Sequence, residues 1–197
     1  YCRARICTRT STASRASTSR STRFRTTAPP TRSTRFGWGH RSSHSAAIAA
    51  ETTGLTALVG TPWFDRDLFN ACAVCSDGEL KTLYRKRFLP NYGVFDEARY
   101  FRAGDAPMVL EVNGTRIGLA VCEDIWYPSP VASDLAAARV DLVCCISASP
   151  YHRGKGRERE EIFRRVATGK NVPVAMVNMV GGQDELIFDG SSALIAP

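Results

Sequence analysis

The chain has 197 residues, of which 44% are hydrophobic and 23% charged, and its formal net charge is +7. That charge is confined to the first 45 residues, which hold ten of the 26 basic residues and no Asp or Glu, while residues 46–197 carry 16 basic and 19 acidic residues. We therefore expect neither nucleic acid as a partner of the folded part nor a membrane, since no apolar run approaches the roughly 18 residues of a spanning helix.

Residues 1–45 are also unusual in holding nine Ser and nine Thr but no Lys. Three interpretations are open: an organelle transit peptide, a basic arm that holds nucleic acid through its phosphates, and a gene segment translated out of frame. In each case we expect this segment to be poorly ordered, because it has too few apolar residues to offset the entropy of the chain.

From about Ser45 onward the pattern predicts a mixed α/β layer fold. Turn dipeptides and apolar periodicity place, in chain order, a helix stopped by Gly54, a buried strand 55–59, a hairpin of 68–75 with 80–85, a hairpin of 108–112 with 115–121, a helix 131–139, a strand 142–148, a helix 157–170 and a strand 173–180. The two hairpins turn at Asp77-Gly78 and Asn113-Gly114, dipeptides that favour type I′ turns.

The seven cysteines favour a reducing compartment, so we expect the cytoplasm. Cys72 and Cys75 have the spacing of a redox or zinc pair, but residues three apart on a strand point to opposite faces. The adjacent Cys144 and Cys145 diverge in the same way. We therefore expect no metal site.

Cys122 carries the strongest chemical signal, because it follows the apolar strand 115–121 and precedes Glu123 and Asp124. The thiolate is the reactive form of cysteine, and two adjacent carboxylates oppose its formation. A nucleophilic Cys122 therefore needs a nearby cation, for which Lys86 is the candidate. An ammonium there could also stabilise the oxyanion that forms when a thiolate attacks an amide. The competing interpretations are a buried structural cysteine and a solvated surface lysine.

Four segments, in order, resemble one family: 84–97, 122–126 (Cys-Glu-Asp-Ile-Trp), 149–155 and 178–186. The family is the glutaminase (amidase) domain of bacterial glutamine-dependent NAD synthetases, a branch of the nitrilase or carbon-nitrogen hydrolase superfamily. The resemblance covers roughly residues 46–197. It implies a nitrilase-like α-β-β-α sandwich, here expected to be a fragment incomplete at both ends.

The resemblance also implies roles for individual residues. Cys122 matches the nucleophile that forms a thioester with L-glutamine and releases ammonia, and Lys86 matches the lysine that stabilises the tetrahedral intermediate. Glu97 resembles a supporting glutamate, with a solvated charge as the alternative. The positions that match glutamine-binding residues are Tyr92, Ser149 and Lys155. Ser149 and Lys155 follow the strand 142–148 and Cys122 follows 115–121, so we expect them at the carboxyl ends of neighbouring strands.

The resemblance further implies the partners of the chain. Ammonia would pass to a synthetase domain, which uses ATP and Mg to amidate deamido-NAD, and the full-length protein would form a homo-oligomer. The amidase part itself needs no cofactor. The chain contains nothing like the Ser-Gly-Gly-rich ATP loop of the synthetase domain.

One part of the family pattern is missing. The chemistry needs a base to move the thiol proton to the leaving ammonia, and the family uses a glutamate in a motif resembling Phe-Pro-Glu-Leu. No such motif exists here, and the first acidic residue, Glu51, falls in the predicted helix before Gly54. This favours the out-of-frame interpretation of residues 1–45, and we expect the chain as written to be inactive.

Two further functions stay open: a stand-alone nitrilase-type amidase for another small amide, and a non-catalytic partner-binding remnant of the fold. The segments 149–155 and 181–185 favour the glutamine branch by resemblance. From its residues alone, 181–185 is a Gly-rich turn between two strands.

Overall fold

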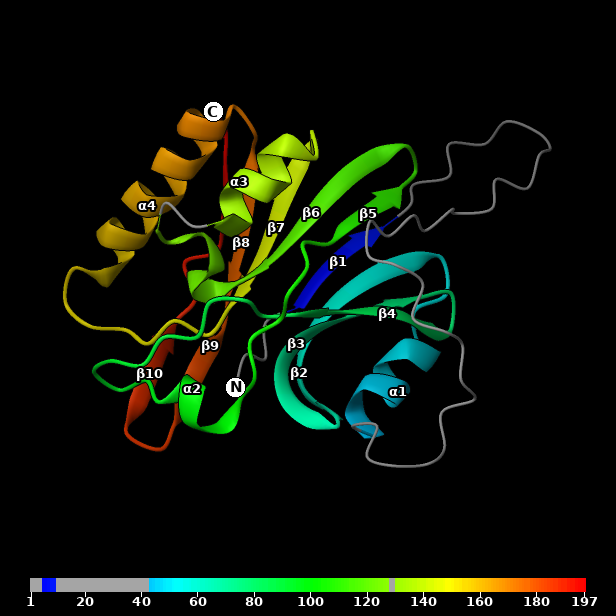
Figure 1. Ribbon diagram of the computed structural model, residues 1–197, viewed down its shortest axis with the longest axis horizontal. Coiled ribbons are helices and arrows are strands. Elements are labelled where there is room, and N and C mark those ends of the chain that lie inside the picture. The colour runs from blue at the N-terminus through cyan, green and yellow to red at the C-terminus, as the bar shows by residue number, and fades with distance from the viewer. Residues whose placement is uncertain (1–4, 10–42, 128–129) are drawn as a thin grey trace.

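Two β-sheets face each other across an apolar core in the computed structural model, which describes residues 5–9, 43–127 and 130–197 (Figure 1). The first sheet is antiparallel, in the order β1-β2-β3-β4, with β1 at Arg5–Arg9, β2 at Leu55–Asp65, β3 at Asp67–Ser76 and β4 at Glu79–Arg85. The second has the order β11-β8-β7-β6-β5, with β5 at Val109–Val112, β6 at Thr115–Val121, β7 at Leu142–Ser147, β8 at Val174–Asn178 and β11 at Ala193–Ile195.

The three central strands of the second sheet, β6, β7 and β8, are parallel, and the edge strands are antiparallel to them. A separate two-stranded hairpin is formed by β9 at Val180–Gln183 and β10 at Leu186–Asp189. The helices are α1 at Ser43–Ala50, α2 at Glu97–Tyr100, α3 at Pro130–Ala137 and α4 at Lys155–Lys170, and a 3-10 turn, η1, spans Cys122–Ile125.

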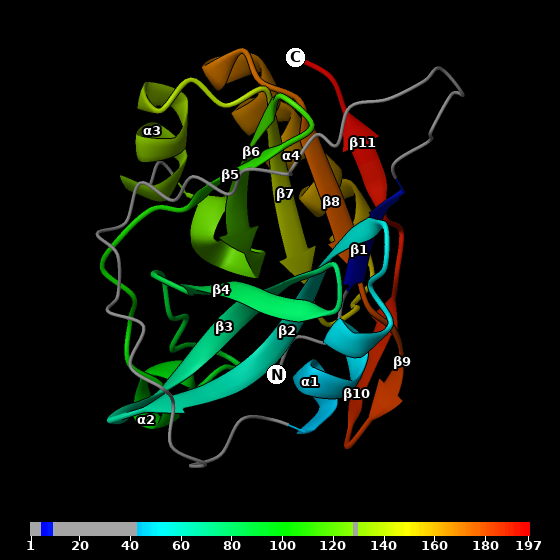
Figure 2. The same ribbon diagram turned by 90° about the vertical axis from the view of Figure 1, so that its right-hand side faces the viewer.

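The apolar side chains divide into layers that match this arrangement. Leu58 and Val74 of the first sheet meet Leu119 and Ile146 of the second in the central core. Figures 1 and 2 show α3 and α4 on the outer face of the second sheet and α1 beside the first. The buried Phe163 of α4 belongs to the outer α-β core. The layers therefore run α-β-β-α, which confirms the predicted fold class.

The local turn chemistry is also as predicted. Asp77 and Gly78 have φ of 50° and 80°, and Asn113 and Gly114 have φ of 51° and 81°. Paired left-handed residues match the right-handed twist of two strands, which is why these dipeptides close hairpins.

The cysteines of each strand diverge as expected. Cys72 packs in the central core between the sheets, while Cys75 packs with α1 on the other face. Cys144 lies in the central core and Cys145 in the core beneath α3 and α4. Across the described ranges, no three His, Cys, Asp or Glu side chains gather as metal ligands would. None of the described helices is both long and apolar enough to cross a membrane.

The structure differs from the sequence predictions at several places, one of which is the predicted strand 173–180: β8 ends at Asn178 and a new strand, β9, begins at Val180. β2 continues to Asp65 instead of ending at 59, because β3 pairs with it along almost its full length. Gly181 and Gly182 belong to β9, so the predicted Gly-rich turn narrows to residues 184–185. Residues 5–9, within the segment expected to be poorly ordered, form β1. Residues 1–4 and 10–42 lie outside the described residues. They make up most of the segment 1–45, for which three interpretations are open.

Gly104 provides a test of how closely the segment after β4 is packed. A Cβ at Gly104 would lie 2.3 Å from the backbone oxygen of Arg85, whereas one at Gly169 in α4 would meet nothing within 4 Å. Because backbone must shift to admit the methyl group, we expect Gly104→Ala to lower the free energy of unfolding by about 1–3 kcal/mol. Gly169→Ala should leave it unchanged or raise it by up to about 1 kcal/mol, since alanine favours helix. Urea unfolding followed by circular dichroism measures both, and equal effects would contradict the packing argument.

Candidate active site

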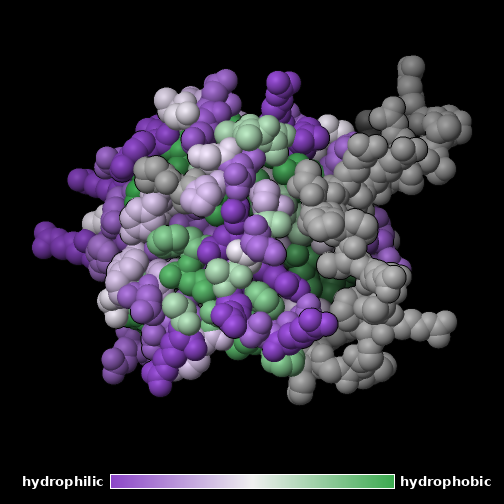
Figure 3. All heavy atoms as spheres, in the orientation of Figure 1, coloured by the Kyte–Doolittle hydropathy of each residue, from purple (hydrophilic) through white to green (hydrophobic). Residues whose placement is uncertain are grey.

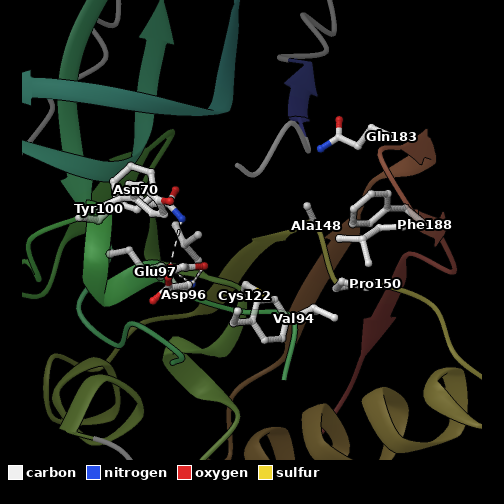
Figure 4. A pocket seen from close by; sticks show the side chains of 15 residues that line it. Asn70, Val94, Asp96, Glu97, Tyr100, Cys122, Ala148, Pro150, Gln183 and Phe188 are labelled. Carbon is white, nitrogen blue, oxygen red and sulfur yellow. Dashed lines mark hydrogen bonds and ion pairs between the residues drawn. The ribbon is translucent and has the colours of Figure 1, made fainter. Parts of the chain in front are cut away.

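A cavity of about 280 Å³ opens where the carboxyl ends of β6 and β7 face α2 and the β9–β10 hairpin (Figure 4). Its lining includes Asn70, Lys86, Val94, Asp96, Glu97, Tyr100, Val121, Cys122, Ala148, Pro150, Gln183, Leu186 and Phe188. Figure 4 shows Asn70, Tyr100 and Glu97 on one side, and Gln183 and Phe188 on the other. Figure 3 shows apolar residues gathered near the centre of the face drawn, and Val94, which lines the cavity, is 65% exposed. The cavity thus combines an apolar rim with a charged interior.

Cys122 lies at the point where β6 ends and η1 begins. Its φ of 49° lies in the left-handed region, which is uncommon for a residue with a side chain. Cys122 is 6% exposed and lines the cavity. Strained backbone of this kind clusters at functional sites, and here it sits at the predicted nucleophile.

Lys86 is fixed from several directions. Its Nζ donates to both carboxylate oxygens of Glu97, at 2.8 and 2.7 Å. Its backbone N–H donates to the carbonyl of Asn70, and its own carbonyl accepts from the N–H of Gly104, both at 2.8 Å. Lys86 is 1% exposed, so the alternative of a solvated surface lysine is wrong. Glu97 accepts hydrogen bonds from the buried ammonium of Lys86. The alternative that Glu97 is only a solvated charge is therefore also wrong.

The Cys122 thiol and the Lys86 ammonium each shift the pKa of the other. Burial raises the pKa of the Cys122 thiol, Lys86 opposes that shift, and nearby carboxylates, foremost Glu123, add to it. Burial would lower the pKa of Lys86, but the charges of Cys122 and Glu97 outweigh it, so the pKa of Lys86 is raised. The ammonium thus remains charged beside the sulfur, which is the arrangement that a thiolate requires.

A cluster of polar side chains, called here the Glu123 cluster, lies beside the cavity and consists of Glu123, Tyr92, Lys155 and Trp126. Tyr92 donates its hydroxyl proton to Glu123 Oε1 at 2.6 Å, and burial, together with this bond, raises the pKa of Tyr92. Lys155 Nζ lies 4.1 Å from the ring centroid of Trp126, and its charge acts on Glu123. Glu123 Oε2 and Trp126 Nε1 are buried without a hydrogen-bond partner in the described structure. Sequence reasoning treated Glu123 only as a charge that opposes the thiolate and missed this grouping.

Two hydrogen bonds of its backbone hold Ser149 in place. Its N–H donates to Asn178 Oδ1 at 2.8 Å, and its carbonyl accepts from Arg159 Nη1 at 3.4 Å. Ser149 is 2% exposed. The structure therefore brings Cys122, Lys86 and Glu97 into one cavity, whereas the predicted glutamine-binding residues are absent from its lining; these are Tyr92, Ser149 and Lys155.

The β9–β10 hairpin forms the far wall and is anchored by a buried arginine. Arg159 of α4 is 1% exposed, and its Nη2 donates to both carboxylate oxygens of Asp189 at 2.6 Å. Tyr151, in the loop after β7, also donates its N–H to the carbonyl of Ile187 at 2.7 Å. The wall of the cavity thus depends on α4 and on this loop.

Comparison with known proteins adds to this geometry. The family Carbon-nitrogen hydrolase matches residues 11–197. The chain is 48% identical over 139 residues to a glutamine-dependent NAD(+) synthetase of Aquifex aeolicus, covering 71% of this chain and 24% of that protein. It is 47% identical over 143 residues to the enzyme of that name from Thermotoga maritima, covering 72% and 25%. The chain thus spans about a quarter of the length of these curated relatives.

Among solved structures, a glutamine-dependent NAD+ synthetase from Acinetobacter baumannii in complex with adenosine diphosphate superimposes with a TM-score of 0.73. The two are 36% identical, and the match covers 77% of this chain and 29% of the other.

The Lys86–Glu97 pair should matter for stability far more than an ion pair at the surface. Glu97→Gln removes the charge that faces a buried ammonium, so we expect the free energy of unfolding to fall by about 3 kcal/mol. The control is Glu160→Gln, because Glu160 pairs with Arg164 and both side chains are exposed; its effect should stay below about 1 kcal/mol. Chemical denaturation measures both, and equal losses would show that burial does not strengthen the pair.

The Arg159–Asp189 pair should make the free energy of unfolding depend on pH in the acidic range. Burial would raise the pKa of Asp189, but the hydrogen bond and charge of Arg159 outweigh it, so the pKa lies below the usual value of 3.8. A carboxyl with a depressed pKa stabilises the fold above about pH 4 and loses that contribution as pH falls through the folded value. We therefore expect Asp189→Asn to unfold more readily than the parent at pH 7, with the difference shrinking below about pH 4. Asp105→Asn, at an exposed position, is the control, and a difference that grows in acid would contradict the assignment.

Proposed function

Because this chain belongs to the carbon-nitrogen hydrolase family, we propose that its cavity hydrolyses the side-chain amide of L-glutamine through the thiol of Cys122. The observation that carries the proposal is the placement of Cys122 and a buried, charged Lys86 on one cavity. Thiolate and ammonium are what acyl transfer from an amide needs: a nucleophile and a positive group for the oxyanion.

The proposed reaction has two halves. The Cys122 sulfur attacks the amide carbon, the carbonyl electrons move to oxygen beside Lys86, and collapse of this intermediate breaks the C–N bond. Nitrogen leaves as ammonia with the proton that the thiol gave up, and a thioester remains. Water then attacks the thioester, which yields glutamate and restores the thiol.

The Glu123 cluster favours the proposal that the substrate is an amino acid. Glu123 has a buried oxygen that no described residue binds, and Lys155 supplies a positive charge near it. A carboxylate and an ammonium close together match the α-ammonium and α-carboxylate of glutamine, with its side-chain amide extending toward Cys122. Tyr92 holds Glu123 in place, and Ser149 adds a hydroxyl near the carboxyl end of β7.

We propose that the chain is inactive or nearly so toward glutamine, because no described residue replaces the base of the family motif. The acidic residues that line the cavity are Asp96 and Glu97. Both oxygens of Glu97 accept from Lys86, and Asp96 pairs with Arg99. Loss of a general base costs about 10² to 10⁴ in rate.

The relatives suggest the wider setting. Two of them are named glutamine-dependent NAD(+) synthetases, so we propose that the ammonia serves amidation of deamido-NAD by a synthetase domain that uses ATP and Mg. We propose a homo-oligomer for such a full-length protein and the cytoplasm as its location. The amide hydrolysis proposed here draws only on side chains of the chain itself and so requires no cofactor.

Covalent capture tests the nucleophile independently of turnover. A chloroketone analogue of glutamine should alkylate Cys122, with loss of chloride, and peptide mass spectrometry locates the added mass. We expect Cys122→Ala to abolish labelling and ammonia release, and Lys86→Met to slow both at least about tenfold. Cys144→Ala, which removes a thiol buried in the central core, should preserve both.

The outcome also separates the competing functions. Ammonia release that persists in Cys122→Ala would overturn the proposal. Faster release from acetamide than from glutamine would indicate an amidase for another small amide, and the absence of both labelling and turnover would indicate a non-catalytic remnant.

A further inference from the structure

Asp124 is the most fully buried acidic residue beside the cavity, with 0% exposure, and it does not line the cavity itself. Four donors among the described residues bind its carboxylate. Oδ1 accepts from the backbone N–H groups of Arg87 and Phe88, at 3.0 and 2.8 Å. Oδ2 accepts from the hydroxyl of Tyr84 at 2.8 Å and from the N–H of Val121 at 2.9 Å.

These four donors come from two separate segments. Tyr84, Arg87 and Phe88 lie on both sides of Lys86, at the end of β4 and just beyond it. Val121 is the last residue of β6 and directly precedes Cys122. One carboxylate therefore joins the segment that carries the ammonium to the turn that carries the thiol.

We infer that Asp124 is a positioning residue that holds Lys86 beside Cys122. This inference rests on the function proposed above, in which the ammonium must stay within reach of the sulfur and of the oxyanion. Asp124 acts through its hydrogen bonds to the two segments and not by contact with a substrate.

A competing explanation is that Asp124 only adds a negative charge. The charged groups that act on Cys122 are Lys86, which favours the thiolate, and the carboxylates of Glu123, Glu97 and Asp124, which oppose it. If Asp124 were only a charge, its removal would make the thiolate easier to form. If Asp124 holds Lys86 in place, its removal would let the ammonium drift away and make the thiolate harder to form. The two explanations predict opposite signs.

Two variants test the inference. Asp124→Asn keeps the shape but replaces one oxygen by an NH₂ group, and with the remaining oxygen facing Arg87 and Phe88, that group meets the N–H of Val121. Tyr84→Phe removes one of the four hydrogen bonds without changing any charge near Cys122. Asp134→Asn is the matched control, because Asp134 binds the side chain of Arg87 at 2.7 Å without taking part in the four-bond arrangement.

The readout is the rate at which iodoacetamide alkylates Cys122 as a function of pH, with the modified residue located by peptide mass spectrometry. We expect Asp124→Asn to raise the apparent pKa of the thiol and to slow alkylation at pH 7.5 by about threefold or more. Tyr84→Phe should shift both in the same direction to a smaller extent, and Asp134→Asn should match the parent. An unchanged or faster rate in Asp124→Asn would overturn the inference. If that variant does not fold, Tyr84→Phe decides by the same criterion.

Lys86→Met separates this inference from the proposed function. If Lys86→Met raises the apparent pKa of Cys122 but Asp124→Asn does not, the thiolate–ammonium pair stands and the positioning role is wrong. If Lys86→Met leaves the pKa unchanged, the thiolate–ammonium pair itself fails, and the proposed function fails with it.

Discussion

The site depends on one ammonium group that is held out of water. An unpaired buried charge costs several kcal/mol, so Lys86 can be buried only because Glu97 accepts two hydrogen bonds from it. The same ammonium favours the thiolate of Cys122 against the combined effect of burial and nearby carboxylates. The rest of the architecture serves to bring β4 and β6 together so that these groups meet.

The layered fold makes this meeting possible. β4 belongs to the first sheet and β6 to the second, and the two sheets share one apolar core. Close packing keeps the sheets at a fixed separation, since such interiors have few voids and resist deformation. Parallel strands β6 and β7 then end at the same edge, which places Cys122 and the loop after β7 side by side. The cavity takes Cys122 and Pro150 from these ends, whereas its charged side chains come from the segment after β4 and from α2.

Much of the fold follows from local rules, and much of the site does not. Asp77-Gly78 and Asn113-Gly114 close hairpins because their backbone preferences are local. The length of β2 depends on a partner strand, which no pattern within β2 reveals. Lys86 was put forward as the cation for Cys122 because a thiolate needs a nearby positive charge, and the family resemblance implied the same pair; spacing in the sequence did not reveal it. The convergence of side chains on Glu123, and of backbone donors on Asp124, depends on the paths of distant loops and so has no signature in the sequence.

The β9–β10 hairpin differs from the other walls of the cavity in how it is attached. Its strands pair with each other and with no other described strand, and its main buried polar anchor is the contact between Arg159 and Asp189. Elements with few anchors open in local steps that cost less free energy than unfolding of the whole domain. We therefore expect this wall of the cavity to open locally at a lower cost in free energy than the strands that hold the reactive sulfur and its cation.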